Sequence, residues 1–186
     1  MFAVLVLVLF ALGGCAASGQ YGESLRTPSP PGYAVASREA TGGLEHVELV
    51  PTGQSASGWT ERVATEVLKG GVEEGDPVRF SEWMAGQWKN ECPDSKVGSV
   101  ESGHRNGYPF AYWRMDCARK ASTGRPEVTV TLALEGTYAF YTVQKSWRAT
   151  PTDDEVASWK RSYFDAVTVC DSRAEAGHPC SAAPAR

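Results

Sequence analysis

The dipeptide Asn106-Gly107 lies between two segments with the character of strands, Val97–Ser102 and Tyr108–Met115. Asn-Gly is the pair that a two-residue type I′ turn prefers, because both turn positions need a positive φ angle. The segment therefore predicts a β-hairpin. A chain that contains this hairpin must supply further strands or helices to cover it.

Alternation of apolar and polar side chains predicts further strands, since successive side chains of a strand point to opposite faces. After Gly136, the last of these strands is expected to pair back on the one before it. The predicted strands are Leu44–Val50, Thr60–Leu68, Val128–Leu134 and Tyr138–Trp147.

Two segments carry the signals of a helix start. Asp76-Pro77 places Asp at the N-cap and Pro at the first helical position, and this helix is expected to end near Cys92. Thr152 and Glu155 are spaced as a capping box. Each helix has an apolar stripe that we expect to be buried. The stripes are Phe80, Trp83, Met84 and Trp88 in the first helix, and Val156, Trp159, Tyr163, Phe164 and Val167 in the second.

Together these elements predict an α+β fold, with two helices packed on a largely antiparallel sheet of five or six strands. Residues 33–171 are expected to form this one domain. Residues 15–32, rich in Ser, Gly and Pro, are expected to be a flexible tether, and residues 172–186 an irregular C-terminal tail.

The segment Leu12-Gly13-Gly14-Cys15 directly follows an apolar stretch, Phe2–Ala11. This stretch is shorter than the roughly 20 residues that span a bilayer, and it fits the apolar part of a secretory signal. The pattern resembles the bacterial lipoprotein signal, in which the cysteine carries diacylglycerol and a further acyl chain such as palmitate. We therefore expect residues 1–14 to be a signal peptide and Cys15 to be the lipidated N-terminus. The alternatives are a signal cleaved elsewhere or an apolar segment that merely contains a cysteine.

The residues after Cys15 bear on location. Ala16 and Ala17 follow it, and no Asp stands there. By resemblance to the sorting rule of enteric bacteria, this favours the outer membrane, with the domain facing the periplasm.

The chain has 5 cysteines, and assigning Cys15 to lipid leaves an even set for an oxidising compartment. Four cysteines allow three pairings. We favour Cys92 with Cys117 and Cys170 with Cys180, because each pair closes a short loop. A metal site of Cys170, His178 and Cys180 is the alternative, but its spacing fits no familiar zinc pattern. No metal and no cofactor are therefore expected.

Charge and motifs exclude several classes of function. The formal net charge is −4 and no basic cluster occurs, which argues against nucleic-acid binding. No nucleophile elbow, zinc-protease motif or phosphate-binding glycine loop is present. Single histidines (His46, His104 and His178) and the acidic pairs Glu73-Glu74 and Asp153-Asp154 have simpler explanations as strand, turn, tail or solvated residues. We predict no catalytic residue.

Aromatic residues are the remaining candidates for a binding surface. On the helix stripes, Trp83, Trp88 and Trp159 are assigned to the core. The others lie near the predicted hairpin or before a strand, where one face can be exposed. The candidate ligand surface consists of Trp59, Tyr108, Tyr112 and Trp113.

Three short segments, Glu48-Leu49-Val50-Pro51, Gly53-Gln54 and Trp59-Thr60-Glu61, precede a strand, a Trp-bearing helix and a four-strand meander. This order resembles uncharacterised proteobacterial envelope lipoproteins and, more distantly, PsbP-like α/β/α domains. The resemblance implies helices packed on a sheet and a binding or accessory role more often than catalysis.

The resulting expectation is a membrane-anchored, non-enzymatic module that binds or steadies another envelope protein. An immunity or inhibitor lipoprotein and a small periplasmic hydrolase are the alternatives. An enzyme should show a concave pocket with convergent polar groups, whereas a binding module should show an exposed patch.

Overall fold

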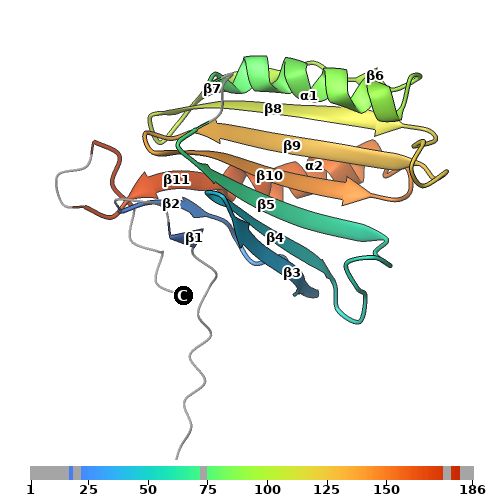
Figure 1. Ribbon diagram of the computed structural model, residues 1–186, viewed down its shortest axis with the longest axis horizontal. Helices are drawn as coiled ribbons and strands as arrows, with labels where there is room; N and C mark the ends of the chain where they lie inside the picture. The colour runs from blue at the N-terminus through green and yellow to red at the C-terminus, as the bar shows by residue number, and fades with distance from the viewer. Residues whose placement is uncertain (1–16, 19–21, 72–74, 174–176, 181–186) are drawn as a thin grey trace, which may run out of the picture.

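A computed structural model describes residues 17–18, 22–71, 75–173 and 177–180. Its main element is an antiparallel sheet with the strand order β3-β4-β5-β10-β9-β8-β6, in which β7 also pairs with β8 (Figure 1). These strands are β3 (Tyr33–Thr41), β4 (Leu44–Pro51), β5 (Glu61–Lys69), β6 (Lys96–Val97), β7 (Glu101–Arg105), β8 (Tyr108–Cys117), β9 (Glu127–Glu135) and β10 (Ala139–Trp147). The α+β fold expected from the sequence is confirmed, with a larger sheet of eight strands among the described residues.

Helices lie on opposite faces of this sheet (Figure 1). One face packs against α1 (Pro77–Glu91), which contacts β8 and β9. The other face packs against α2 (Asp153–Ser162), the short 3₁₀ helix η2 (Phe164–Ala166) and a small sheet. The small sheet has the order β1-β2-β11 and consists of β1 (Ala17–Ser18), β2 (Glu23–Arg26) and β11 (Thr168–Asp171).

The local signals of the sequence appear at their expected positions. Asp76 caps α1 by accepting the backbone N–H groups of Val78 and Arg79, and Thr152 caps α2 by accepting that of Glu155. Asn106 and Gly107 have φ angles of 48° and 82°, the positive values that a type I′ turn needs. The first arm of the hairpin, expected as one strand over 97–102, is divided into β6 and β7.

The expected tether is in part folded. β2 pairs with β11, and β1 pairs with β2, so strands occupy positions within residues 15–32. Glu23 is fully buried and accepts the N–H groups of Thr137 and Tyr138 and the hydroxyl of Tyr141. Burial of a carboxylate with three donors attaches this segment firmly to the domain. The prediction of a flexible tether is therefore wrong for residues 23–26.

Two disulfides are present, with the pairing favoured from the sequence. Cys92–Cys117 joins the C-cap of α1 to the end of β8, and Cys170–Cys180 joins β11 to the segment that follows residues 174–176. The backbone of Asp171 also bonds to His178 and Cys180, so this part of the expected tail is held on the domain. Among the described residues, no helix is long and apolar enough to cross a membrane.

Candidate functional site

The face of the sheet that carries α1 is covered over only part of its width. α1 contacts β8 and β9, where Trp113, Met115 and Ala133 form a small core with Phe80 and Phe140. Farther along the same face, the side chains are polar. Glu66 of β5 lies beside Thr142 of β10 on one side and beside His46 of β4 on the other. The boundary between the covered and the open part is a groove.

This groove, here called the α1 groove, has a volume of about 360 Å³. Trp83 is 46% exposed and Leu44 38% exposed, which is high for large apolar side chains. Trp83 stacks on Phe80 with ring centroids 5.5 Å apart. The groove is lined by Leu44, Leu68, Phe80, Trp83, Met84 and Phe140, with Glu66, Thr142 and Gln144 as its polar members.

A charged cluster lies beside the α1 groove. The Nδ1 atom of His46 is 3.1 Å from Oε1 of Glu66, and its Nε2 atom is 3.4 Å from Oε1 of Glu48. Arg62 donates to the same Glu48 oxygen at 2.6 Å, and Thr142 donates to Glu66 at 3.0 Å. Because Arg62 already pairs with Glu48, Glu66 is the carboxylate at the groove that a further cation can approach.

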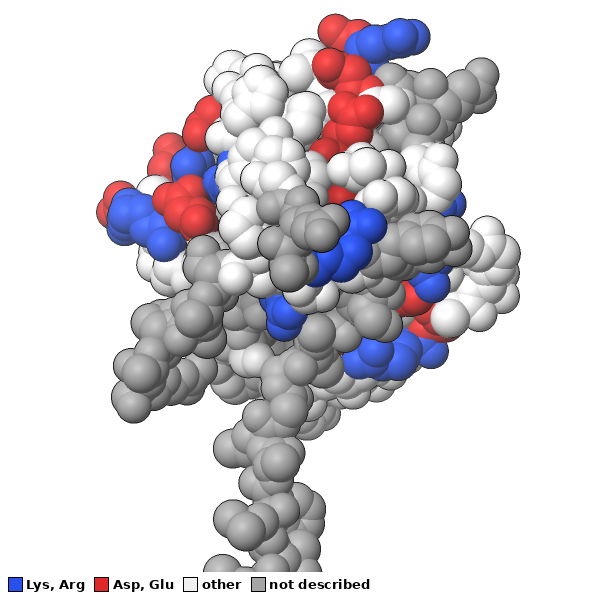
Figure 2. Space-filling model, turned by 90° about the vertical axis from the view of Figure 1, so that its left-hand side faces the viewer, with Lys and Arg blue, Asp and Glu red and all other residues white. Residues whose placement is uncertain are grey.

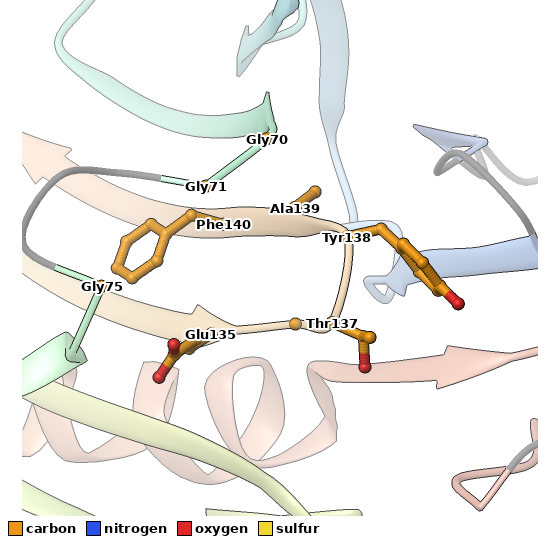
Figure 3. Close-up of a pocket in the computed structure, with 9 residues that line it drawn as sticks. Gly70, Gly71, Gly75, Glu135, Thr137, Tyr138, Ala139 and Phe140 are labelled. Carbon is orange, nitrogen blue, oxygen red and sulfur yellow. The ribbon is translucent and has the colours of Figure 1, made fainter.

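A second hollow, of about 430 Å³, lies at the β9–β10 turn (Figure 3). Its walls are largely backbone, with Gly70, Gly71 and Gly75 on one side. Glu135 and Phe140 point to the same side of this hollow, whereas Tyr138 points away (Figure 3). Burial, with a contribution from Asp76, raises the pKa of Glu135. One carboxylate among glycines lacks the convergent polar groups of an active site.

On the opposite face of the sheet, Lys145 is buried in a cage of aromatic rings. Its Nζ atom lies 4.3 Å from the ring centre of Trp159 and 4.9 Å from those of Tyr33 and Trp147. It donates to the Tyr33 hydroxyl at 2.6 Å and to Glu61 Oε2 at 2.5 Å. Lys145 thus occupies the cation position of its own cage.

The environment of this cage shifts three pKa values. Burial lowers the pKa of Lys145 to about 8, although Glu61 and Glu155 oppose the shift. Burial also acts to raise the pKa of Glu61, but hydrogen bonds from Lys145 and Tyr33 outweigh it and lower that pKa. Burial and the Glu61 carboxylate raise the pKa of Tyr33. Because the side chain of Lys145 is fully buried, the cluster acts as a link between β3, β5, β10 and α2.

The ligand surface predicted from aromatic residues is wrong at three positions. Trp59, Tyr108 and Trp113 are 4%, 4% and 1% exposed. The guanidinium groups of Arg62 and Arg148 lie 4.7 and 3.9 Å from the ring centre of Trp59, and Trp113 lies beneath α1 against Phe80. Tyr112 is partly buried against Phe164, and burial raises its pKa to about 12. Cys15, the predicted lipid site, lies outside the described residues.

Trp83 is the residue that the sequence misplaced in the other direction. It was assigned to the core because it belongs to the apolar stripe of α1. Phe80, Met84 and Trp88 of this stripe pack on the sheet, whereas Trp83 lies at its edge and stays exposed. Trp88 and Trp159 are partly buried, as part of the cores they were assigned to. The sequence did contain an indication of this exposure. Trp83 and Met84 are adjacent, and two adjacent residues of a helix cannot face the sheet equally.

The three histidines show no catalytic arrangement in the described part of the chain. His46 contacts two carboxylates, and the ring of His178 packs on Tyr108 with centroids 4.5 Å apart. His104 is exposed on β7. Within the described ranges, no group of three or more His, Cys, Asp or Glu residues is placed to hold a metal ion.

No protein-family model matches the chain, and comparison with curated proteins gives no match. Among solved structures, the chain is similar to the Ran-binding protein Mog1p of Saccharomyces cerevisiae at 14% identity and a TM-score of 0.47, over 75% of this chain and 77% of that one. A Mog1 mutant matches at 12% identity and a TM-score of 0.49, over 75% of this chain and 78% of that one. PsbP (CyanoP) from Synechocystis matches at 11% identity and a TM-score of 0.47, over 85% of this chain and 98% of that one. These similarities are at low sequence identity and at TM-scores below 0.5.

Proposed function

We propose that this chain is a lipid-anchored binding module of the bacterial envelope, whose α1 groove takes an apolar side chain from a basic segment of another envelope protein. The observation that carries this proposal is the α1 groove itself, with Trp83 and Leu44 exposed at its mouth. Contiguous apolar exposure rimmed by polar residues is typical of interaction sites.

The dimensions and charge of the α1 groove favour a peptide segment as its occupant. About 360 Å³ accommodates one or two large side chains rather than a whole element. Glu66, at the polar end, attracts a Lys or Arg of the partner, and the acidic balance of the chain acts in the same direction. A basic side chain next to an apolar one therefore matches both ends of the groove.

The lipid anchor is proposed from the sequence. Leu12-Gly13-Gly14-Cys15 has the order of a lipoprotein signal, and Ala16 and Ala17 favour the outer membrane with the domain in the periplasm. The presence of two disulfides in the remaining cysteines is consistent with an oxidising compartment.

Site-specific photocrosslinking in cells tests the binding role. A photoreactive amino acid at Trp83 should capture a discrete partner. The same residue at Lys89 should capture much less, because Lys89 is exposed six residues farther along the helix and about 120° around its axis from Trp83. Glu66→Lys should reduce capture at Trp83 at least several-fold by repelling a basic segment. Equal capture at Trp83 and Lys89, or capture unaffected by Glu66→Lys, contradicts the proposed groove.

The anchor has a separate test. The intact mass of the protein purified from membranes should exceed that of the chain from Cys15 by the mass of the lipid, and Cys15→Ser should lose this addition. A protein without added mass refutes lipidation and leaves the groove experiment valid.

A further inference from the structure

The small sheet begins almost directly after the predicted lipid site. Only Ala16 separates Cys15 from β1, whose residues pair with β2 in the register Ala17–Leu25 and Ser18–Ser24. Two residues of extended chain reach at most about 7 Å. The acyl chains on Cys15 would therefore enter the bilayer next to this sheet.

The sheet is held on the domain by buried contacts. Glu23 accepts the backbone N–H groups of Thr137 and Tyr138 at 2.8 and 3.2 Å and the Tyr141 hydroxyl at 3.0 Å. On the same face of β2, Leu25 is 2% exposed within the large core. Even if β1 detached, the eight residues from Cys15 to Glu23 would span at most about 28 Å. The domain thus has little freedom to turn away from its anchor.

On the outer face of the small sheet, Ser24 and its β11 partner Cys170 are buried, so Arg26 is the exposed side chain among the described residues of β2 and β11. Glu23 and Leu25 point into the domain, so Arg26 projects from the opposite face of β2 and is exposed. Arg26 has no ion pair among the residues that the structure describes. Figure 2 shows this end of the molecule, where acidic side chains are more frequent toward the top and basic ones in the middle and lower part.

We infer that the end of the domain that carries the β1–β2–β11 sheet faces the membrane, with Arg26 on lipid phosphates. This inference rests on the proposed lipidation of Cys15. α1 lies on the far side of the molecule from β1 (Figure 1). The α1 groove is consequently presented away from the bilayer, so its partner is a segment that extends into the periplasm rather than one embedded in the same membrane.

Energy transfer to a lipid-bound acceptor tests this orientation. The lipidated protein is placed in phosphatidylcholine vesicles with and without phosphatidylglycerol, and a donor is attached through a noncanonical amino acid at Ser172, beside β11, or at Gln87 on α1. Both positions are exposed. We expect transfer to be several-fold more efficient from Ser172 than from Gln87. Equal efficiency from the two positions overturns the inference.

Two variants examine the cause of the orientation. A 20-residue Gly/Ser insertion between Ala16 and Ala17, which adds a reach of about 25 Å, should reduce the difference between the two donors. Arg26→Glu should lower transfer from Ser172 in the anionic vesicles, whereas Arg26→Lys should retain it. Transfer that is insensitive to both changes contradicts the role of the short anchor and of Arg26.

The orientation and the anchor can fail separately. Cys15 is the single cysteine outside the two disulfides, so a maleimide phospholipid can be attached to it in the chain from residue 15 onward. If cells add no lipid, the proposed anchor is refuted by mass. If either lipid-bearing protein shows equal transfer from Ser172 and Gln87, the orientation alone is refuted.

Discussion

The two faces of the large sheet are built from the same alternating strands but are covered to different extents. The face toward α2 is covered by α2, η2 and the small sheet, and its core includes Val63, Tyr141 and Leu132. The face toward α1 is covered only over β8, β9 and the adjacent part of β10, which leaves Trp83 and Leu44 exposed. Coverage, rather than strand composition, therefore decides where this protein has a surface for binding.

Ionisable groups follow the same division. On the covered face, Glu23 and Lys145 are fully buried, and each has several hydrogen-bond partners. On the open face, His46 and Glu66 stay partly exposed and contact each other at 3.1 Å. Replacing a group on the covered face should therefore affect folding, whereas replacing one on the open face should affect binding.

Glu23→Ala is expected to have the largest effect on stability. It leaves the N–H groups of Thr137 and Tyr138 and the Tyr141 hydroxyl without their acceptor, at a cost of about 4 kcal/mol. Glu23→Gln, which keeps one acceptor oxygen, should cost about half as much. Urea denaturation followed by tryptophan fluorescence measures both. An Ala variant as stable as the wild type would mean that the carboxylate does not hold the small sheet in place.

The Cys92–Cys117 disulfide is the next largest contribution that can be removed. It closes a loop of sequence separation 25, for which chain entropy predicts a loss of about 3.5 kcal/mol in Cys92→Ser/Cys117→Ser. The bond also joins the end of α1 to β8, so the double variant should weaken capture at the α1 groove. The matched control is Cys170→Ser/Cys180→Ser, which removes a disulfide of sequence separation 10. It should lower the free energy of unfolding by about 2.7 kcal/mol without affecting the α1 groove.

Short-range signals accounted for much of the fold. Asp76 as N-cap, Thr152 as N-cap and the Asn106-Gly107 turn each depend on residues within four positions of one another, so the sequence predicted them correctly. β2 was missed, because it forms by pairing with β11 more than 140 residues later and its neighbourhood is rich in Ser and Pro. β3 was missed for a related reason, since as an edge strand it exposes most of its residues and shows little alternation.

The candidate site was the part that sequence could not provide. The stripe of Phe80, Trp83, Met84 and Trp88 correctly predicted an amphipathic helix, but the width of sheet beneath it depends on where β8 and β9 lie. Conversely, Trp59 was considered for a binding surface, because nothing in the neighbouring sequence indicates that the Arg62 and Arg148 guanidinium groups pack on its ring. Whether a side chain is exposed depends on which other elements pack over it, and the residue pattern of one helix or strand does not show this.

Lys145 gives the covered face a pH dependence. Burial lowers the pKa of Lys145 from its usual 10.5 to about 8, so between these values the unfolded chain binds more protons and the free energy of unfolding rises with pH. This contribution, about 2 kcal/mol by pH 10, should be absent in Lys145→Met and retained in the exposed control Lys89→Met. The raised pKa values of Tyr33 and Tyr141 act in the opposite direction above pH 10 in all three proteins. Urea denaturation at pH 7, 8, 9 and 10 measures the difference, and parallel curves for wild type and Lys145→Met would contradict it.

Trp83→Ala should have the smallest effect on folding and the largest on binding. The side chain is 46% exposed and makes its ring contact with Phe80, so its removal should cost less than about 1 kcal/mol. With the photoreactive residue moved to Leu44, on the other side of the α1 groove, Trp83→Ala should abolish capture of the partner, while Lys89→Ala should leave it unchanged. A loss of several kcal/mol would place Trp83 in the core and remove the contrast between the two faces. Undiminished capture in Trp83→Ala would instead show that the partner does not bind through Trp83. An apolar side chain that is needed neither for folding nor for binding has no role in the groove.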